Sequence, residues 1–326
     1  MDLAKPKSGP RRALHAAIAV LLLVLPLAMG HFDYNYGILI CCFIMLYTVA
    51  VSGLDISFGY CGQISMGHAG FFAIGAYGSA LLHHYLAVPI PLAMVVASAL
   101  ATGIGAVLAW PASKLVFHFL SLATIAFGEI VFQVISHSPR NLTGNFSGFF
   151  STSVSVFGYT FDTYTKYYYF ALFCTFLLLL AKTTLINSRV GRGFIAIREN
   201  HHAANGMGIN VRKYKVIAFA TGAFYTAFAG AMYVHLVRFI SPDTFMQKQS
   251  VLFVTMLLFG GSGSLAGPII GSGAVLLLNE ALRSAERYQM LIYGILLLVV
   301  ILMIPGGIYG TLKKIVRNIK RGKEAC

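Results

Sequence analysis

The sequence predicts an all-α fold, a polytopic membrane protein of about ten transmembrane helices. Hydrophobic residues make up 58% of the 326 residues, and charged residues only 10%, against about 25% in soluble domains. The apolar residues gather in runs whose lengths approach the roughly 20 residues that cross a bilayer as a helix. Such a chain cannot cover itself with the polar shell of a soluble fold, and its apolar content excludes a disordered chain.

Ten apolar runs are the candidate spans, and we expect eight to ten of them to cross the membrane. In chain order they are 13–30, 37–54, 63–82, 89–110, 115–137, 167–181, 214–236, 249–261, 264–282 and 289–304. Repeated glycines interrupt the third run, which predicts a broken or re-entrant segment because glycine lets the backbone leave helical geometry. The eighth run is short, and the ninth begins with glycines.

The basic residues orient these spans. When ten spans alternate, most of the 24 Lys and Arg residues, Lys182 among them, fall on the side of both chain ends, as cytoplasmic residues do. We therefore expect one membrane domain, with an N-terminal tail at 1–12, a bundle at 13–304 and a basic tail at 305–326. The bundle includes a large cytoplasmic loop at 182–213. Because the basic residues separate apolar runs, they do not favour nucleic acid as a partner. A signal peptide is the less favoured alternative at the start, because its apolar run would span only about 7–15 residues.

Motifs for covalent or metal chemistry are absent from the sequence. It contains no GxxxxGK[ST] phosphate loop, no HExxH and no GxSxG, so we expect neither enzyme activity nor ATP hydrolysis by this chain. Its five cysteines form no CxxC pair, and the adjacent pairs His83–His84 and His201–His202 would point about 100° apart on a helix. We therefore expect no bound metal and no cofactor in the chain itself.

Polar residues at membrane depth mark the first candidate site. The segment 53–80 is dense in Gly and Ser and carries Asp55, together with the candidate pathway residues Gln63, Ser65, Gly67 and His68. Non-helical backbone at this depth is tolerated only where it is buried in protein or lines a water-filled path. Tight packing of polar helices is the alternative, and we expect both: a packed helix whose polar edge faces a conduit.

Glu129 is the second candidate, because a carboxylate inside a span costs about 2.5–3.5 kcal/mol unless it is paired or hydrated. It lies in the run 122–134. Two roles stay open, a residue of a pathway or gate and a structural hydrogen bond to a neighbouring helix. A proton relay is disfavoured because no chain of Asp, Glu or His accompanies Glu129 on this span.

The loop at 191–215 predicts a short amphipathic helix flanked by glycines. Basic residues there could merely hold anionic lipid. That alternative does not explain two small residues followed by a glycine, a pattern that suits a helix seated in a groove of another protein. The loop residues that we expect at such a contact are Gly191, Arg192, Arg198, Glu199, Ala203, Ala204 and Gly208.

The outer segment 238–250 contains Ser241, Pro242 and Asp243. This triplet suits the start of a helix, with a capping residue and a proline in the first turn. Contact with an external partner is the alternative interpretation of this triplet.

Six segments together resemble one family, the permease subunits of high-affinity branched-chain amino acid ABC transporters, in their LivM-like branch. The segments follow the family's order and cover most of residues 45–310. They are GYCGQISMGHAGFFAIGAY, LATIAFGEI, GRGFIAIREN, AANGMGINVRKYKVIAF, RFISPDTF and GGSGSLAGPIIG. The chain departs from the family pattern at Asp55, where Asn is usual, at His202, where Glu often stands, and at Ile304, where Arg is usual.

The resemblance implies a multi-pass permease of the bacterial inner membrane. It would pair with a second homologous permease subunit, with two ATPase subunits that bind ATP and Mg, and with a periplasmic substrate-binding protein. Ala203, Ala204 and Gly208 match the family's coupling motif for the ATPases, and Ser241, Pro242 and Asp243 are the candidate contact with the binding protein. The implied substrates are branched-chain amino acids, related amino acids, urea or short amides.

Three other classes compete with this interpretation. An ATP-independent secondary carrier for a small polar solute would need inverted repeats and carboxylates near the midplane, and the sequence shows few buried acids. A channel would need no helix facing an ATPase. A membrane-embedded enzyme would need a nucleophile and a base, and no such pair is visible.

Overall fold

The computed structural model describes residues 23–26, 35–112, 117–156, 159–283, 291–292, 294–295, 298 and 307–311. The spans predicted at 13–30 and 289–304, and the two terminal tails, lie largely outside these residues. The fold is described below for the rest of the chain.

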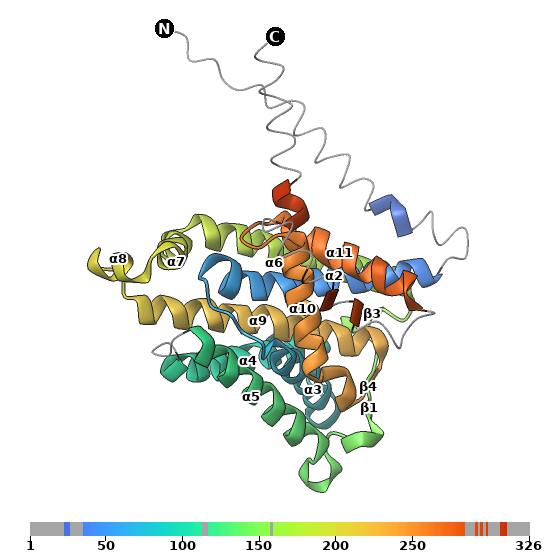
Figure 1. The fold of residues 1–326 in the computed structure, drawn as a ribbon. Coiled ribbons are helices and arrows are strands. Elements are labelled where there is room, and N and C mark those ends of the chain that lie inside the picture. Colours follow the sequence, from blue (N-terminus) through green and yellow to red (C-terminus); the bar gives the residue numbers. More distant parts are fainter. Residues whose placement is uncertain are drawn as a thin grey trace, which may run out of the picture.

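Helices account for almost all of the described chain, which confirms the all-α prediction (Figure 1). The helices of the bundle are α2 (Asn35–Leu54), α3 (His68–Leu86), α4 (Ile90–Ala112), α5 (Phe117–Ser136), α6 (Tyr164–Asn187), α9 (Val211–Val237), α10 (Gln247–Gly260) and α11 (Ala266–Ala281). A π-helix, η1 (Asp55–Tyr60), continues α2. Five of these segments are long and apolar enough to cross a membrane, namely Asn35–Tyr60, Ile90–Pro111, Phe119–Ser136, Tyr164–Asn187 and Val211–Val237.

Helix α9 forms the centre of the bundle and packs along α2, α3 and α4. Small residues let these helices approach closely. A Cβ atom at Gly75 of α3 would lie only 1.8 Å from the carbonyl oxygen of Ala227, and one at Gly230 of α9 only 1.9 Å from that of Phe72. The interface between α3 and α9 therefore depends on backbones in direct contact, as small residues allow in membrane helices.

The break predicted in the run 63–82 is present. Residues 61–67 form no helix, and α3 begins only at His68. Burial alternates along this non-helical segment. Cys61, Gln63 and Ser65 are buried, whereas Gly62, Ile64 and Met66 are half-exposed.

Short elements join the helix ends on the side away from α7. They are η2 (Pro139–Asn141), η3 (Asn145–Ser147), β1 (Phe149–Phe150), β2 (Ser155–Val156), β3 (Tyr159–Thr160), β4 (Phe239–Ile240) and η4 (Pro242–Phe245). Strand β1 pairs antiparallel with β4, and β2 with β3. The pairing of β1 with β4 ties the loop after α5 to the end of α9 (Figure 1).

Candidate functional site

Two short helices, α7 (Arg189–Glu199) and α8 (His201–Gly206), lie outside the bundle between α6 and α9 (Figure 1). Each begins at a side-chain cap. The Ser188 hydroxyl accepts hydrogen bonds from the N–H groups of Val190 and Gly191, and the Asn200 carboxamide accepts them from His202 and Ala203. Such caps satisfy the free N–H groups of a first turn. The chain therefore contains the predicted helical loop, as two helices that meet at Asn200.

Helix α7 is amphipathic, as predicted, with one face packed on the bundle and the other exposed. Gly191, Gly193, Phe194 and Ile197 are buried against the bundle. A Cβ atom at Gly193 would lie 2.3 Å from the ring of Tyr214 in α9, so the glycine lets the helix lie flat on that helix. Arg192, Ile195, Arg198 and Glu199 lie on the exposed face.

Gly208 ends α8 in a Schellman motif. The N–H of Ile209 donates to the carbonyl of Ala204, the N–H of Gly208 donates to that of Asn205, and Gly208 has a φ of +83°. This is the left-handed cap position that favours glycine because a side chain is strained there. No atom crowds Gly208, so the backbone conformation alone accounts for the glycine.

The α8 side chains divide between the bundle and solvent. Ala204 is buried, whereas Ala203 is exposed and Met207 is 83% exposed. Beside them lies an open groove of about 570 Å³, lined by His201, His202, Asn205, Gly208, Ile209, Asn210, Val211 and Arg212. Desolvation, and secondarily the charges of His202 and Lys215, lowers the pKa of His201, which favours its neutral form near pH 7.

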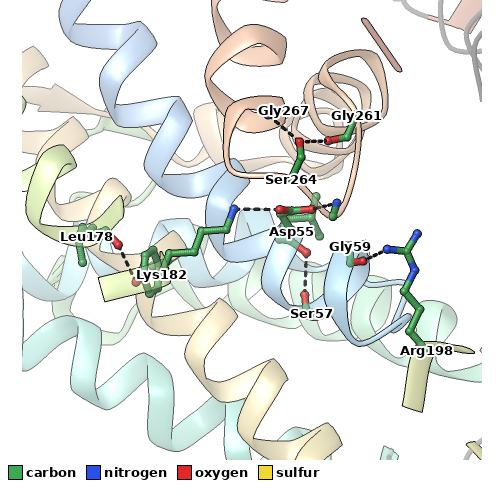
Figure 2. Close-up of polar contacts among 12 residues, drawn as sticks. Asp55, Ser57, Gly59, Leu178, Lys182, Arg198, Gly261, Ser264 and Gly267 are labelled. Carbon is green, nitrogen blue, oxygen red and sulfur yellow. Dashed lines mark hydrogen bonds and ion pairs between the residues drawn. The ribbon is translucent and has the colours of Figure 1, made fainter. Parts of the chain in front are cut away.

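A buried ion pair joins the end of α2 to α6. Lys182 Nζ lies 2.9 Å from Asp55 Oδ2, and neither side chain has any exposed surface. The other carboxylate oxygen, Asp55 Oδ1, accepts a hydrogen bond of 2.7 Å from the N–H of Gly263, in the turn between α10 and α11. Asp55 therefore holds three segments together (Figure 2).

Arg198 of α7 reaches the same region from the other side. Its Nη1 donates to the carbonyl oxygen of Gly59 in the π-helix (Figure 2). There is no room for a side chain at Gly59, because a Cβ atom there would lie 1.8 Å from Asp55 Oδ1. π-helical turns are rare and often mark functional positions. Here the turn brings Asp55 and the Gly59 carbonyl to the two cations.

The predicted pathway residues lie inside the chain. Gln63, Ser65, Gly67 and His68 are all buried, and His68 Nδ1 lies 2.9 Å from Ser65 Oγ. Backbone bonds fix the same segment from two other helices. The N–H of Met66 donates to Thr124 Oγ1 of α5, and Gln247 Nε2 of α10 donates to the carbonyl of Met66. The partly exposed edge of this segment belongs instead to Ile64 and Met66.

Glu129 lies on the exposed face of α5, and its Oε1 accepts a hydrogen bond of 2.9 Å from Gln133 Nε2 one turn later. Ile130 and Val134, on the same face, are 62% and 63% exposed. This hydrogen bond of Glu129 therefore stays within α5 and reaches no neighbouring helix.

The outer triplet begins a helix, though a short one. Pro242 is the first residue of the four-residue 3₁₀ helix η4, and Ser241 precedes it without forming a side-chain cap. Pro242 is buried, Ser241 is half-buried and Asp243 is exposed. Only Ser241 and Asp243 therefore offer side-chain surface to an external partner.

Lys182 is the residue that sequence reasoning placed in the wrong environment. Counted among the basic residues of the cytoplasmic loop, it is instead fully buried beside Asp55. A signal was present, because Asp55 and Lys182 are isolated opposite charges near the ends of two apolar runs. Buried ionisable residues in membrane proteins usually pair with one another.

A bundle of span-length apolar helices, with a polar break inside it and an amphipathic helix pair outside it, defines a polytopic membrane protein of the permease class. Residues 38–301 match the family described as the permease component of the branched-chain amino acid transport system. The chain belongs to this family.

Individual relatives support the assignment. The chain is 28% identical over 337 residues to the high-affinity branched-chain amino acid transport system permease protein LivM of Escherichia coli, covering 93% of this chain and 79% of the relative. It is 24% identical over 318 residues to a probable LivM of Methanocaldococcus jannaschii, covering 81% and 90% of the two chains. It is 36% identical over 140 residues to LivH of Escherichia coli, covering 42% and 45%. No solved structure matches the chain.

Proposed function

We propose that this permease is one of two homologous permease subunits of an ABC importer for branched-chain amino acids or related amino acids and amides. The observation that carries the proposal is the helix pair α7–α8, which packs one face on the bundle and leaves another exposed. That geometry suits a helix that sits in a groove of another protein. In this proposal two ATPase subunits bind ATP and Mg, and the chain itself holds no cofactor and performs no covalent chemistry.

The seven loop residues named in the sequence analysis would have different roles in coupling. Arg192, Glu199 and Ala203 are exposed and would contact the ATPase. Gly191, Ala204 and Gly208 would shape the pair, and Arg198 would fasten it to the bundle. ATP binding would then move α7 and α8 as one body, and the permease pair would alternate between outward-open and inward-open states by the rigid-body displacements typical of such switches.

The exposed face of α5 suits the second permease subunit. Glu129 and Gln133 place polar groups on a span-length face that would otherwise meet lipid, where a carboxylate is costly. We assign Glu129 to a hydrated path between the two subunits. The buried residues Gln63, Ser65, Gly67 and His68 would hold the non-helical segment 61–67 in place, and its half-exposed residues Ile64 and Met66 would border that path.

The opposite end of the bundle would receive a substrate-binding protein from the periplasm. Ser241 and Asp243 lie there, beside the pairing of β1 with β4. This orientation puts the chain in a bacterial inner membrane with both termini, and the pair α7–α8, in the cytoplasm. The excess of basic residues on the α7 side supports it.

An ATP-independent carrier or channel for a small polar solute is the second candidate, and purification separates the two. The tagged chain would be extracted from its native membrane in a mild detergent, and the proteins recovered with it identified by mass spectrometry. We expect two P-loop ATPases and a second permease. Recovery of the chain alone, with solute uptake that ignores ATP, would overturn the proposal in favour of a carrier or channel.

A further inference from the structure

Two cationic side chains fasten the same structural unit to the same turn. Ser188 separates α6 from α7 by a single residue, so Lys182 near the end of α6 and Arg198 near the end of α7 belong to one connected piece. Lys182 binds Asp55 at the start of the π-helix, and Arg198 binds the carbonyl of Gly59 near its end. Figure 2 shows both cations directed at this turn from different elements.

The turn that they hold leads directly into the non-helical segment 61–67. Only Tyr60 lies between Gly59 and that segment. Cys61 and Gly62 follow directly, and Arg198 also packs on Gly62, whose Cβ position lies 3.4 Å from the Arg198 Cγ. A displacement of α7 therefore acts on the non-helical backbone at its first residues. The path contains no flexible linker.

The third member of the arrangement is the turn between α10 and α11. Gly263 has a φ of +73° and donates its N–H to Asp55, and its Cβ position lies 2.7 Å from Arg198 Nη1. Both cations are therefore also connected to this turn. Lys182 is connected through the carboxylate of Asp55, and Arg198 packs on the turn directly. The α6–α7 piece is connected at two points to two separate parts of the bundle.

Close packing alone would not require a charged side chain at position 182 or at position 198. An apolar pair of similar volume is often as stable as a buried ion pair or more so, whereas an ion pair specifies one geometry. A strong, directional contact suits a joint that must move as one piece. The Gly59 carbonyl is likewise held by a charge-assisted bond, of the stronger kind.

We propose that Lys182 and Arg198 are positioning residues that transmit movement of α7 to the non-helical segment 61–67 through Asp55 and Gly59. This inference rests on the proposed function, because it assumes that a partner ATPase moves α7. It goes further by naming the contacts that carry the movement into the membrane and the segment that receives it.

The test uses the complete transporter reconstituted in proteoliposomes, with Met66→Cys as a reporter in a chain whose native cysteines are replaced by serine. Maleimide labelling of the reporter is compared without nucleotide and after trapping with ATP and vanadate. The variants are Asp55→Asn with Lys182→Met, a neutral pair that leaves no buried charge unpaired, and Arg198→Gln on the exposed face of α7. The control is Lys166→Met, which removes an exposed lysine at the other end of α6.

We expect nucleotide to change the labelling rate in the unaltered transporter and in Lys166→Met. Basal ATP hydrolysis is measured in each variant and serves as that variant's own reference. In the neutral pair and in Arg198→Gln, the nucleotide-dependent change in labelling, and the stimulation of hydrolysis by loaded binding protein, should fall by about tenfold, within the usual range of coupling between sites. A purely structural pair would move neither of these two readouts.

Full stimulation and a full labelling change in either assembled variant would overturn the inference. If the neutral pair fails to assemble, Arg198→Gln decides the question alone, because its side chain lies on the exposed face of α7. A wild-type complex that contains no ATPase, or that hydrolyses ATP without any response to binding protein, would instead count against the proposed function itself.

Discussion

The contact between α3 and α9 and the contact between the π-helical turn and α7 hold neighbouring parts of the bundle by different means. At the first, Gly75 and Gly230 let backbones touch along two regular helices, with one buried hydrogen bond between Ser79 Oγ and His235 Nε2. At the second, Asp55, Lys182 and Arg198 meet at a break in helical geometry. Close-packed apolar contacts resist continuous deformation, whereas a few directional polar contacts define a joint. We infer a rigid scaffold around α9 and a movable joint beside α7.

The largest loss of stability is expected from Lys182→Met. This variant leaves Asp55 as a buried charge without its cation, which costs about 3–5 kcal/mol. Thermal unfolding of the purified protein in mild detergent measures the effect. Lys166→Met serves as its control, because a substitution of an exposed residue usually changes stability by about 0.5 kcal/mol or less. Equal melting temperatures for the two variants would contradict the claim that Lys182 and Asp55 form a buried ion pair.

Replacing Gly75 with Ala tests the backbone contact between α3 and α9. The added methyl group has to displace the backbone of Ala227, so we expect a loss of about 3 kcal/mol, at the upper end of the effects of overpacking. Gly103→Ala is the matched control, since no atom lies within 4 Å of its Cβ position. If both variants fold in equal yield on gel filtration, α3 and α9 are not in backbone contact.

Gly208→Val tests whether the shape of the cap that ends α8 matters for coupling. A β-branched residue at this positive φ strains the cap by about 1–3 kcal/mol, enough to distort α8 while the bundle still inserts. We expect normal membrane levels with uptake lost. Gly208→Asn is the control, because asparagine tolerates this cap position. Equal uptake by the two variants would show that the shape of this cap does not matter for coupling.

The smallest change in stability is expected from Glu129→Gln. The side chain is exposed in the single chain and its partner Gln133 can still bond to it, so stability should change by about 0.5 kcal/mol or less. Solute uptake by the assembled transporter should nevertheless fall if Glu129 lines the proposed path between the two subunits, because the substitution removes its charge. Glu280→Gln, which neutralises a half-buried carboxylate of α11, provides the control. Unchanged uptake in Glu129→Gln would favour a structural role for the residue.

Periodicity and glycine content were sufficient to predict the helices of the bundle and the break after α2. They indicated a single amphipathic helix outside the bundle, which the structure divides into α7 and α8 at Asn200. These features depend on local sequence and on hydropathy. The direction of side chains in the segment 61–67 was not accessible, since the face that Gln63 presents depends on α5 and α10. The burial of Lys182 was missed for a related reason. Charge counting assigns a lysine at a helix end to water unless its partner from another span is known.

The most direct test of the account is the ATP dependence of leucine uptake. Proteoliposomes would contain the chain with the partners that co-purify with it, and binding protein and leucine would be added outside. We predict that uptake requires ATP on the side of α7 and α8, and that Gly208→Val abolishes it without releasing the partners. Equal uptake with and without ATP would contradict the central claim that this permease is driven through its α7–α8 pair.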